Sequence, residues 1–300
     1  MSHMGHAEAQ AGISPMSSSP HGNRGALHPL PGGMTISIQT SFAFRLEKPT
    51  DVLLQFEAAN IPEQEILEHD TRMSDAEHCA WVPAQDDIGE RIWVRAEGEF
   101  QVDYTAKVRL QRQLPDLGGL RRLQPHDMPG EAVQYLFDSR YCPADKFQSF
   151  VEAEFGGSDG GARISAIREW IAQNFTYQSG VSDARTGALD TFVQRAGICR
   201  DFAHVMVTLA RASTIPARYV ACYAPGVEPP DFHAVAEVFL NDPETEGGGT
   251  WQLVDATGMA DPAETVKIGV GRDAADVSFL TSFGSNDFQR SSVEVTREAD

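Results

Sequence analysis

A cysteine in the second half of this 300-residue chain has the position of a reactive thiol. Cys199 follows Gly197 and Ile198, and it begins a stretch in which apolar residues recur at helical spacing. The N-terminus of a helix carries a partial positive charge and free N–H groups, which favour a thiolate and could bind a developing oxyanion. Most single cysteines are inert apolar side chains, so this position needs support from other residues.

A histidine and an aspartate further along the chain could act together with this thiol. His233 lies near the start of a predicted strand, residues 232–240, and Asp255 ends a second predicted strand that begins at residue 250. Alone, a histidine in a strand usually has no special role, and an acid at a strand end usually forms a turn. Together with a cysteine they provide a nucleophile, a base and a group that orients the base.

The spacing of His233 and Asp255 allows the two side chains to meet. If the two strands pair as a hairpin centred near Glu244, His233 faces Asp255. Trp251 then faces Glu237. Facing residues of a strand pair lie about 5 Å apart at Cβ, close enough for a carboxylate to hydrogen-bond an imidazole. A slip of one residue would put them on opposite faces, so this expectation depends on the register.

The chain after residue 130 predicts helices followed by antiparallel strands. Ile164, Ile167, Ile171 and Phe175 recur at steps of three and four residues, which is typical of an amphipathic helix. Further helices are predicted over residues 131–141, 188–194 and 199–212, and strands over 217–223, 232–240 and 250–255. Helices that precede an antiparallel sheet indicate the α+β fold class.

The part of the chain before residue 113 has a different pattern. Apolar and polar residues alternate from Ile36 to Leu46 and from Phe100 to Leu110, which is typical of half-buried antiparallel strands. Residues 113–130 are rich in Pro, Gly and Asp. We therefore predict a β-sandwich over 34–112, a linker over 113–130, a second domain over 131–290 and a tail over 291–300.

The first 33 residues have many His, Pro, Ser and Gly and no hydrophobic periodicity. The opening Met-Ser-His-Met is typical of an expression vector, so we expect residues 1–33 to be a disordered leader with a tag and Met34 to be a natural start. These residues contain no basic segment followed by an apolar stretch, so we predict no signal peptide. Without an export signal we expect reduced thiols and a cytoplasmic protein.

The charge balance bears on possible partners. The chain has 43 acidic residues against 24 Lys and Arg, a formal charge of -19, which repels phosphate backbones and anionic lipid surfaces. No apolar run reaches the roughly 20 residues that span a bilayer. The four cysteines show neither a CxxC pair nor zinc-like spacing. We therefore expect no nucleic acid, membrane, metal or cofactor, and the oligomeric state stays open.

Three segments around these residues resemble one protein family. They are GICRDFAHVMVTLARASTIPARYVACYAPG from residue 197, DFHAVAEVFL from residue 231 and WQLVDATG from residue 251. These segments closely resemble the bacterial transglutaminase-like family of cysteine-protease type, which shares its catalytic fold with papain-like thiol enzymes. The segment YLFDSRYCPAD, residues 135–145, resembles the element that leads into that catalytic domain. The resemblance implies that Cys199 is the nucleophile, His233 the base and Asp255 the acid, in a catalytic domain that follows a β-domain.

Two positions differ from the pattern of that family. Val235 stands two residues after the histidine, where the family often has Trp. Transglutaminases also use an upstream Trp to stabilise the oxyanion, and the sequence has no assured equivalent. Tyr177 is a candidate for that contact or for substrate binding, although a half-buried aromatic at a helix end is its simpler interpretation. The backbone N–H of Cys199 is the oxyanion donor that the sequence supports.

Other polar residues close to these motifs have mainly structural interpretations. His204 lies five residues after Cys199, on a different face of the predicted helix, so we expect it to pack in the core. Arg200 and Arg218 could bind a substrate carboxylate or form ion pairs. Glu237 could provide a supporting hydrogen bond near the site.

The sequence predicts a thiol-dependent amide hydrolase that forms a thioester acyl-enzyme on Cys199 from a peptide or protein amide. An acyl transferase that passes the acyl group to an amine uses the same three residues, and the choice depends on what reaches the thioester. We favour hydrolysis because an assured upstream Trp and a calcium-binding loop pattern are missing. A third alternative is a non-catalytic peptide-binding module, against which the intact set of Cys, His and Asp argues.

Overall fold

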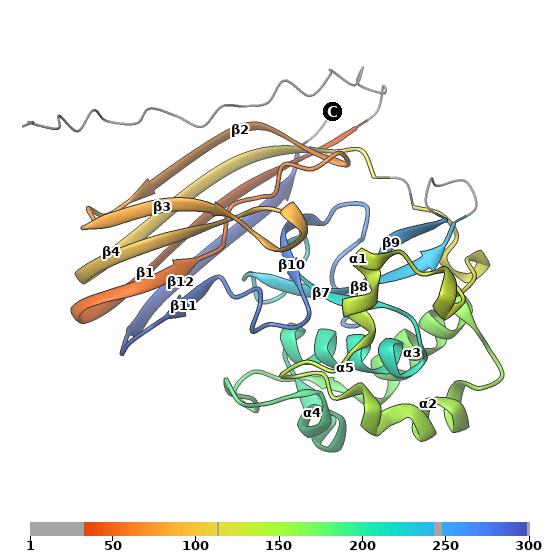
Figure 1. Ribbon diagram of the computed structural model, residues 1–300. Coiled ribbons are helices and arrows are strands. Elements are labelled where there is room, and N and C mark those ends of the chain that lie inside the picture. The colour runs from red at the N-terminus through yellow and green to blue at the C-terminus, as the bar shows by residue number, and fades with distance from the viewer. Residues whose placement is uncertain (1–32, 113, 243–247, 299–300) are drawn as a thin grey trace, which may run out of the picture. The chain divides into compact units, whose positions relative to one another are not determined.

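The computed structural model describes residues 33–112, 114–242 and 248–298, which lie in one unit that begins at Gly32. The predicted leader lies outside the described residues, apart from Gly33. The described chain forms a six-stranded and a four-stranded antiparallel sheet together with helices (Figure 1), which confirms the predicted α+β class. Within these ranges no helix is long and apolar enough to cross a membrane.

The six-stranded sheet is built on two long strands, β1 (Met34–Leu54) and β4 (Glu90–Leu110), which pair antiparallel. The strands that extend it are β2 (Gln64–Met73) and β3 (His78–Pro83) beside β4, and β11 (Leu280–Ser282) and β12 (Asp287–Arg297) beside β1. Alternate side chains of β4 are buried, as expected for strands that cover a core with one face.

The predicted N-terminal domain and the predicted tail both contribute strands to one sheet. The strands of the predicted sandwich belong to one hydrogen-bonded sheet, and its apolar residues pack with Tyr223, Val266 and Ile268 from later in the chain. The predicted tail from residue 291 is wrong because most of it lies in β12, which pairs with β1. Most residues of β12 are exposed, so it lacks the apolar alternation that reveals a strand.

The α-helices lie between Gly130 and Ala212 in the sequence. They are α1 (Gly130–Val133), α2 (Gln148–Phe155), α3 (Gly160–Asn174), α4 (Ala188–Gln194) and α5 (Cys199–Ala212). The helix predicted over 131–141 is wrong beyond its first turns, because the chain is already extended at Phe137. The Phe137 carbonyl and the Ser139 hydroxyl accept hydrogen bonds from Arg211, a tertiary contact that local periodicity cannot show.

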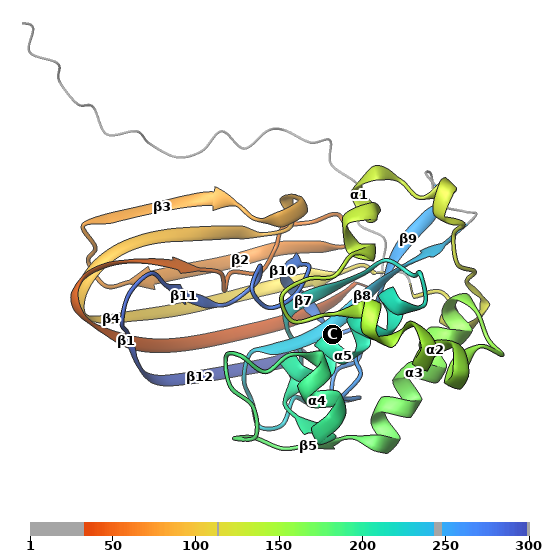
Figure 2. The ribbon, with the colours of Figure 1, turned by 60° about the horizontal axis from the view of Figure 1, so that its bottom comes forward.

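The four-stranded sheet has the strand order β10-β7-β8-β9 and is antiparallel throughout. Its strands are β7 (Ala217–Tyr223), β8 (His233–Asn241), β9 (Gly249–Val254) and β10 (Val266–Gly271). Three of these strands agree with the predicted ones within about one residue, whereas β10 was not predicted. Helix α5 lies against β8, and α3 lies beside α5 (Figures 1 and 2).

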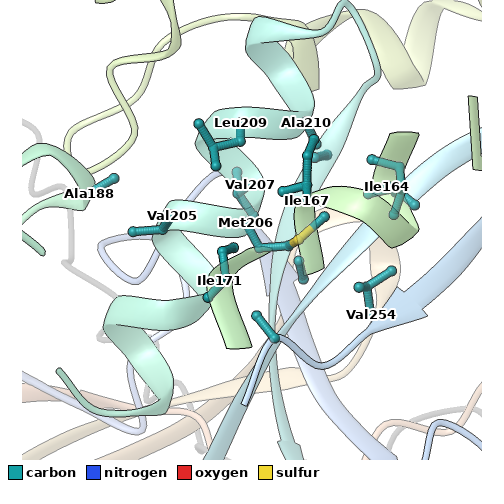
Figure 3. Packing of buried hydrophobic residues seen from close by; sticks show 14 of the residues in the cluster. Ile164, Ile167, Ile171, Ala188, Val205, Met206, Val207, Leu209, Ala210 and Val254 are labelled. Atoms are coloured by element: carbon teal, nitrogen blue, oxygen red, sulfur yellow. The ribbon is translucent and has the colours of Figure 1, made fainter. Parts of the chain in front are cut away.

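Helix α5 is the centre of the core on this side of the sheet. Its residues from Asp201 to Arg211 are all buried. Met206 of α5 lies among Ile167 and Ile171 of α3 (Figure 3). Burial of each large apolar side chain contributes roughly 1.5–3 kcal/mol, so this packing holds the start of α5 in a fixed position.

Buried polar contacts join the two sheets. The side-chain amide of Gln64 in β2 donates to the backbone oxygens of Ala59 and Lys267, at 2.6 and 2.8 Å. The hydroxyl of Tyr223 in β7 donates to the backbone oxygen of Phe56 at 2.7 Å. Because buried hydrogen bonds are costly to leave unmade, these contacts fix the face of the second sheet against the first.

Candidate active site

Cys199 is the first residue of α5, as the sequence predicted. Ile198 precedes it as the N-cap, and the Ile198 N–H donates to Oδ2 of Asp201 at 3.0 Å. Asp201 is fully buried in the first helical turn, where an acid complements the helix dipole. Gly197 has to be glycine, because a Cβ there would lie 2.7 Å from the Cβ of Asp201. These contacts fix the half-buried Cys199 at the helix N-terminus.

His233 and Asp255 meet at the end of the β8–β9 pair. Nε2 of His233 lies 3.1 Å from Oδ2 of Asp255, and both side chains are buried. The predicted register is wrong by two residues, because Trp251 faces Phe239 and not Glu237. The hairpin is centred one residue later in the chain than we assumed. A shift of two residues keeps every side chain on its face, so the two residues still meet.

Asp255 is held by several donors besides the imidazole. The N–H and the hydroxyl of Thr257 donate to Oδ1 at 2.8 and 2.7 Å, and the N–H of Ala260 donates to Oδ2 at 2.7 Å. Burial would raise the pKa of Asp255, but the hydrogen bond and charge of His233, with the bonds from Ala260 and Thr257, lower it. The carboxylate is therefore ionised and fixed beside the imidazole.

The imidazole of His233 has one nitrogen that is not committed to Asp255. With Nε2 at that carboxylate, Nδ1 has no hydrogen-bond partner among the residues that the structure describes. Burial would lower the pKa of His233, but the hydrogen bond with Asp255 and the charges of the Cys199 sulfur and the Asp255 carboxylate raise it to about 9. The ring is thus charged near neutral pH, and Nδ1 is the nitrogen available for proton exchange.

Cys199 and His233 line one cavity of about 410 Å³. The thiol of Cys199 lies 3.9 Å from the backbone oxygen of Phe232, the residue before His233. Tyr177 and Val277 come from different parts of the chain and line the same cavity. A larger cavity, about 660 Å³, has neither cysteine nor histidine in its lining. The smaller cavity is therefore where thiol chemistry could occur.

Tyr177 lies close to the proposed nucleophile. The two-residue strand β5 (Thr176–Tyr177) pairs in parallel with β6 (Ala196–Gly197), which places Tyr177 opposite Gly197. Burial and the charge of Cys199 raise the pKa of Tyr177 to about 12. The hydroxyl and the backbone N–H of Cys199 are thus two groups that could donate to an oxyanion in this cavity.

Sequence reasoning missed one wall of the cavity, which Val277 and Phe279 form. Both residues follow β10, a strand that was not predicted, and they lie far from Cys199 in the sequence. Apolar residues after a strand usually belong to a core, so no signal in the sequence marked them as part of a site.

The charged residues near the motifs form ion pairs. Arg200 lies 2.9 Å from Oδ1 of the buried Asp201. Nε of Arg218 donates to Oε2 of Glu237 at 2.7 Å, and Nζ of Lys267 lies 2.5 Å from Oε1. Glu237 therefore belongs to a buried ion cluster, and within the described chain we find no hydrogen bond from it to His233 or Asp255.

His204 packs in the core, as expected. It is fully buried, its Nε2 accepts from the N–H of Ala274 at 3.1 Å, and its ring stacks on Tyr141 at 5.0 Å between centroids. Burial lowers the pKa of His204 to about 3, so the ring stays neutral.

The other three cysteines lie in environments that disfavour a thiolate. Burial raises the pKa of Cys142 to about 12 and that of Cys222 well above its usual range. Partial burial and the nearby Glu57 raise the pKa of Cys79. These three thiols are therefore protonated near neutral pH and are poor nucleophiles.

Comparison with known proteins places the site within a family. The family model described as "Transglutaminase-like superfamily" matches residues 151–256, a range that includes Cys199, His233 and Asp255. The chain is 32% identical to a "Putative Cysteine Protease" from Cytophaga hutchinsonii, and the two structures superpose with a TM-score of 0.83 over 90% of this chain and 92% of that chain.

Mycobacterial proteins are also similar over part of their length. An uncharacterized protein of Mycobacterium tuberculosis is 31% identical over 137 residues, 42% of this chain and 43% of the relative. One of Mycobacterium leprae is 28% identical over 150 residues, 45% of this chain and 50% of the relative. The matched region thus spans about half the length of these curated relatives or less. The family match and the similarity across nearly the whole Cytophaga protein lead to one conclusion: the chain belongs to the transglutaminase-like superfamily.

Proposed function

We propose that this protein is a thiol-dependent amide hydrolase in which Cys199 is the nucleophile, His233 the base and Asp255 the residue that orients the base. The observation that carries the proposal is the free Nδ1 of a buried, charged His233 at the cavity that Cys199 lines. The superfamily and the name of the Cytophaga hutchinsonii protein also support a thiol enzyme. The proposed substrate is a peptide or protein amide.

The reaction begins with a proton exchange between the thiol and the imidazole. Nδ1 of His233 holds the thiol proton while the sulfur of Cys199 attacks the carbonyl carbon of the amide. The C–S bond forms as the carbonyl electron pair moves onto oxygen. The N–H of Cys199 and the hydroxyl of Tyr177 donate to that oxyanion, and each such donor is worth roughly 10²–10³ in rate.

The tetrahedral intermediate then collapses. His233 gives its proton to the leaving nitrogen, the C–N bond breaks, and a thioester remains on Cys199. His233 next removes a proton from water, whose oxygen attacks the thioester carbonyl. The C–S bond breaks, the carboxylic acid leaves, and the sulfur recovers its proton.

Asp255 contributes by fixing the imidazole. Its carboxylate accepts from Nε2 of His233, which keeps that nitrogen protonated and turns Nδ1 toward the cavity. Thr257 and Ala260 hold the carboxylate in turn, so the ring has little freedom to rotate away.

We propose hydrolysis in preference to acyl transfer on the basis of the sequence. The sequence has no assured equivalent of the upstream Trp of transglutaminases and no calcium-binding loop pattern. Acyl transfer to an amine would use the same nucleophile and base, so it is an outcome that the experiment has to distinguish.

The experiment uses a library of chromogenic peptide amides with the full chain. We expect wild-type protein to release the amine and the free acid, and acid quenching during turnover to trap a thioester on Cys199 that intact mass reveals. Cys199→Ala should lose cleavage, whereas Cys79→Ser, a change at an exposed thiol, should keep it. Cleavage that survives in Cys199→Ala would overturn the proposal, and exclusive formation of a new amide when an amine is added would favour acyl transfer.

A further inference from the structure

The cavity beside Cys199 has an apolar wall. Val277 is buried and packs in one cluster with Cys199, Tyr219 and Ala234. Two residues later, Phe279 stacks on Phe232, with ring centroids 4.7 Å apart and an angle of 11° between the planes. The backbone oxygen of Phe232 lies 3.9 Å from the sulfur of Cys199, and Phe232 and Phe279 line the same cavity as Cys199.

Small side chains leave space in front of this wall. Ala221, Ala234 and Ala274 all line the cavity, and none of them carries a polar side-chain group. Besides His233, the charged side chains of the described lining are already engaged. Arg200 bonds to Asp201 and to the backbone oxygen of Asp183, and Asp231 accepts from the Phe232 N–H at 2.8 Å.

The six-stranded sheet sets the position of the wall. The backbone oxygen of Phe279 accepts from the N–H of Gln55, just after β1, at 3.1 Å. The ring of Phe279 meets the buried Phe42 of β1 edge to face, at 5.7 Å and 81°. The N-terminal sheet therefore forms part of the support of the cavity in addition to packing on the catalytic side.

We infer that this wall is a subsite for an apolar side chain next to the reacting carbonyl, so that the substrates are amides whose acyl part ends in a residue such as leucine. The inference rests on the proposed function, since it concerns the substrate of the same thiol. An apolar side chain that packs against Val277 and Phe279 is removed from water without losing a hydrogen bond. A carboxamide or charged side chain there would lose hydrogen bonds to water and gain none from these two residues.

The test compares matched peptidyl chloromethyl ketones that end in leucine, asparagine or glycine. Leucine and asparagine have nearly the same shape, so their comparison isolates polarity. Intact mass and peptide mapping follow alkylation of Cys199, with displacement of chloride by sulfur. We expect the leucyl reagent to alkylate Cys199 at least about tenfold faster than the asparaginyl and glycyl reagents.

Two variants locate the preference. Phe279→Ala should lower the ratio of the leucyl to the glycyl rate by about five- to tenfold, and Ala221→Leu should lower it by filling the space in front of the wall. The ratio cancels any general change in thiol reactivity. Phe283→Ala is the matched control, because Phe283 is 63% exposed and does not line the cavity, and it should keep the wild-type ratio.

The outcomes separate the two proposals. Equal alkylation of Cys199 by the leucyl and asparaginyl reagents would overturn the apolar subsite and leave the proposed function intact. A wild-type Cys199 that reacts with these reagents no faster than Cys79 would overturn the proposed function, and the subsite would fall with it.

Discussion

Strand β8 carries two buried ionisable side chains on one face, His233 and Glu237, and only His233 borders the cavity with Cys199. Both have strongly shifted pKa values. Burial would raise the pKa of Glu237, but the charges of Arg218 and Lys267 lower it to about 2. Burial would lower the pKa of His233, but the hydrogen bond with Asp255 and the charges of the Cys199 sulfur and the Asp255 carboxylate raise it to about 9.

The two sites differ in what remains uncommitted. Each oxygen of Glu237 lies beside a cation, so its charge is compensated within the cluster. His233 keeps Nδ1 without a hydrogen-bond partner among the described residues, at a cavity that a thiol also lines. Burial and a shifted pKa are common to both side chains, and the ring nitrogen without a partner at a cavity is what distinguishes His233.

Replacement of the thiol should have the largest effect. Cys199→Ala should lower amide cleavage by about 10⁴-fold or more, because no other group can form the thioester. Its free energy of unfolding in urea should change by less than about 1 kcal/mol, since Cys199 is only half-buried. The matched control is Cys142→Ala, which removes a fully buried thiol and should keep cleavage in the folded protein. Loss of cleavage in that control with the fold intact would contradict the assignment.

Breaking the ion cluster should affect stability more than chemistry. Glu237→Ala leaves Arg218 and Lys267 buried without their shared carboxylate, so the free energy of unfolding should fall by about 3–5 kcal/mol. Urea titration followed by circular dichroism measures the change. Glu65→Ala removes a partner of Arg109 from an exposed pair and should cost at most about 1 kcal/mol. Equal losses of unfolding free energy in the two variants would contradict the claim that the buried cluster matters more for stability than an exposed ion pair.

Loss of the orienting carboxylate should lower the rate less than loss of the thiol. Asp255→Asn removes a hydrogen bond and a charge that raise the pKa of His233, so this pKa should fall. Cleavage should drop by roughly a hundredfold. In the pH–rate profile, the decline expected near pH 9 in the wild type should move to lower pH. An unchanged high-pH decline in Asp255→Asn would argue that another group controls it.

The pH dependence of stability is a further expected effect, which is spread over several pH units. The pKa of His233 is raised from 6.5 to about 9 in the folded protein, so its protonation stabilises the fold. This contribution is fully present below about pH 6.5 and is lost as the pH rises through about 9. The free energy of unfolding should fall by about 3 kcal/mol over that range. His233→Gln should flatten the decrease, and a wild-type curve without any decrease would contradict the charged state.

The sequence predicts the candidate site better than it predicts the fold around it. The start of α5 at Cys199 and the strands of His233 and Asp255 follow from local periodicity, and the structure brings His233 and Asp255 together. The predicted register was wrong by two residues, yet the period of a strand is two, so the pair survived the error. The catalytic roles themselves stay a proposal.

What the sequence could not predict depends on contacts between distant parts of the chain. Strand β12 is mostly exposed and is recognisable as a strand through its pairing with β1. Arg211 fixes the extended chain at Phe137, against the local helical pattern. The wall at Phe279 exists because β1 and the segment after β10 meet. No window of neighbouring residues contains such information.

The most direct test of the central claim is competitive alkylation of all four thiols with iodoacetamide near neutral pH, read by peptide mass mapping. We expect Cys199 to be labelled at least about tenfold faster than Cys79, Cys142 and Cys222, whose pKa values are raised, and His233→Ala to slow the labelling of Cys199. Labelling of Cys199 and the exposed Cys79 at equal rates, unaffected by His233→Ala, would contradict the account.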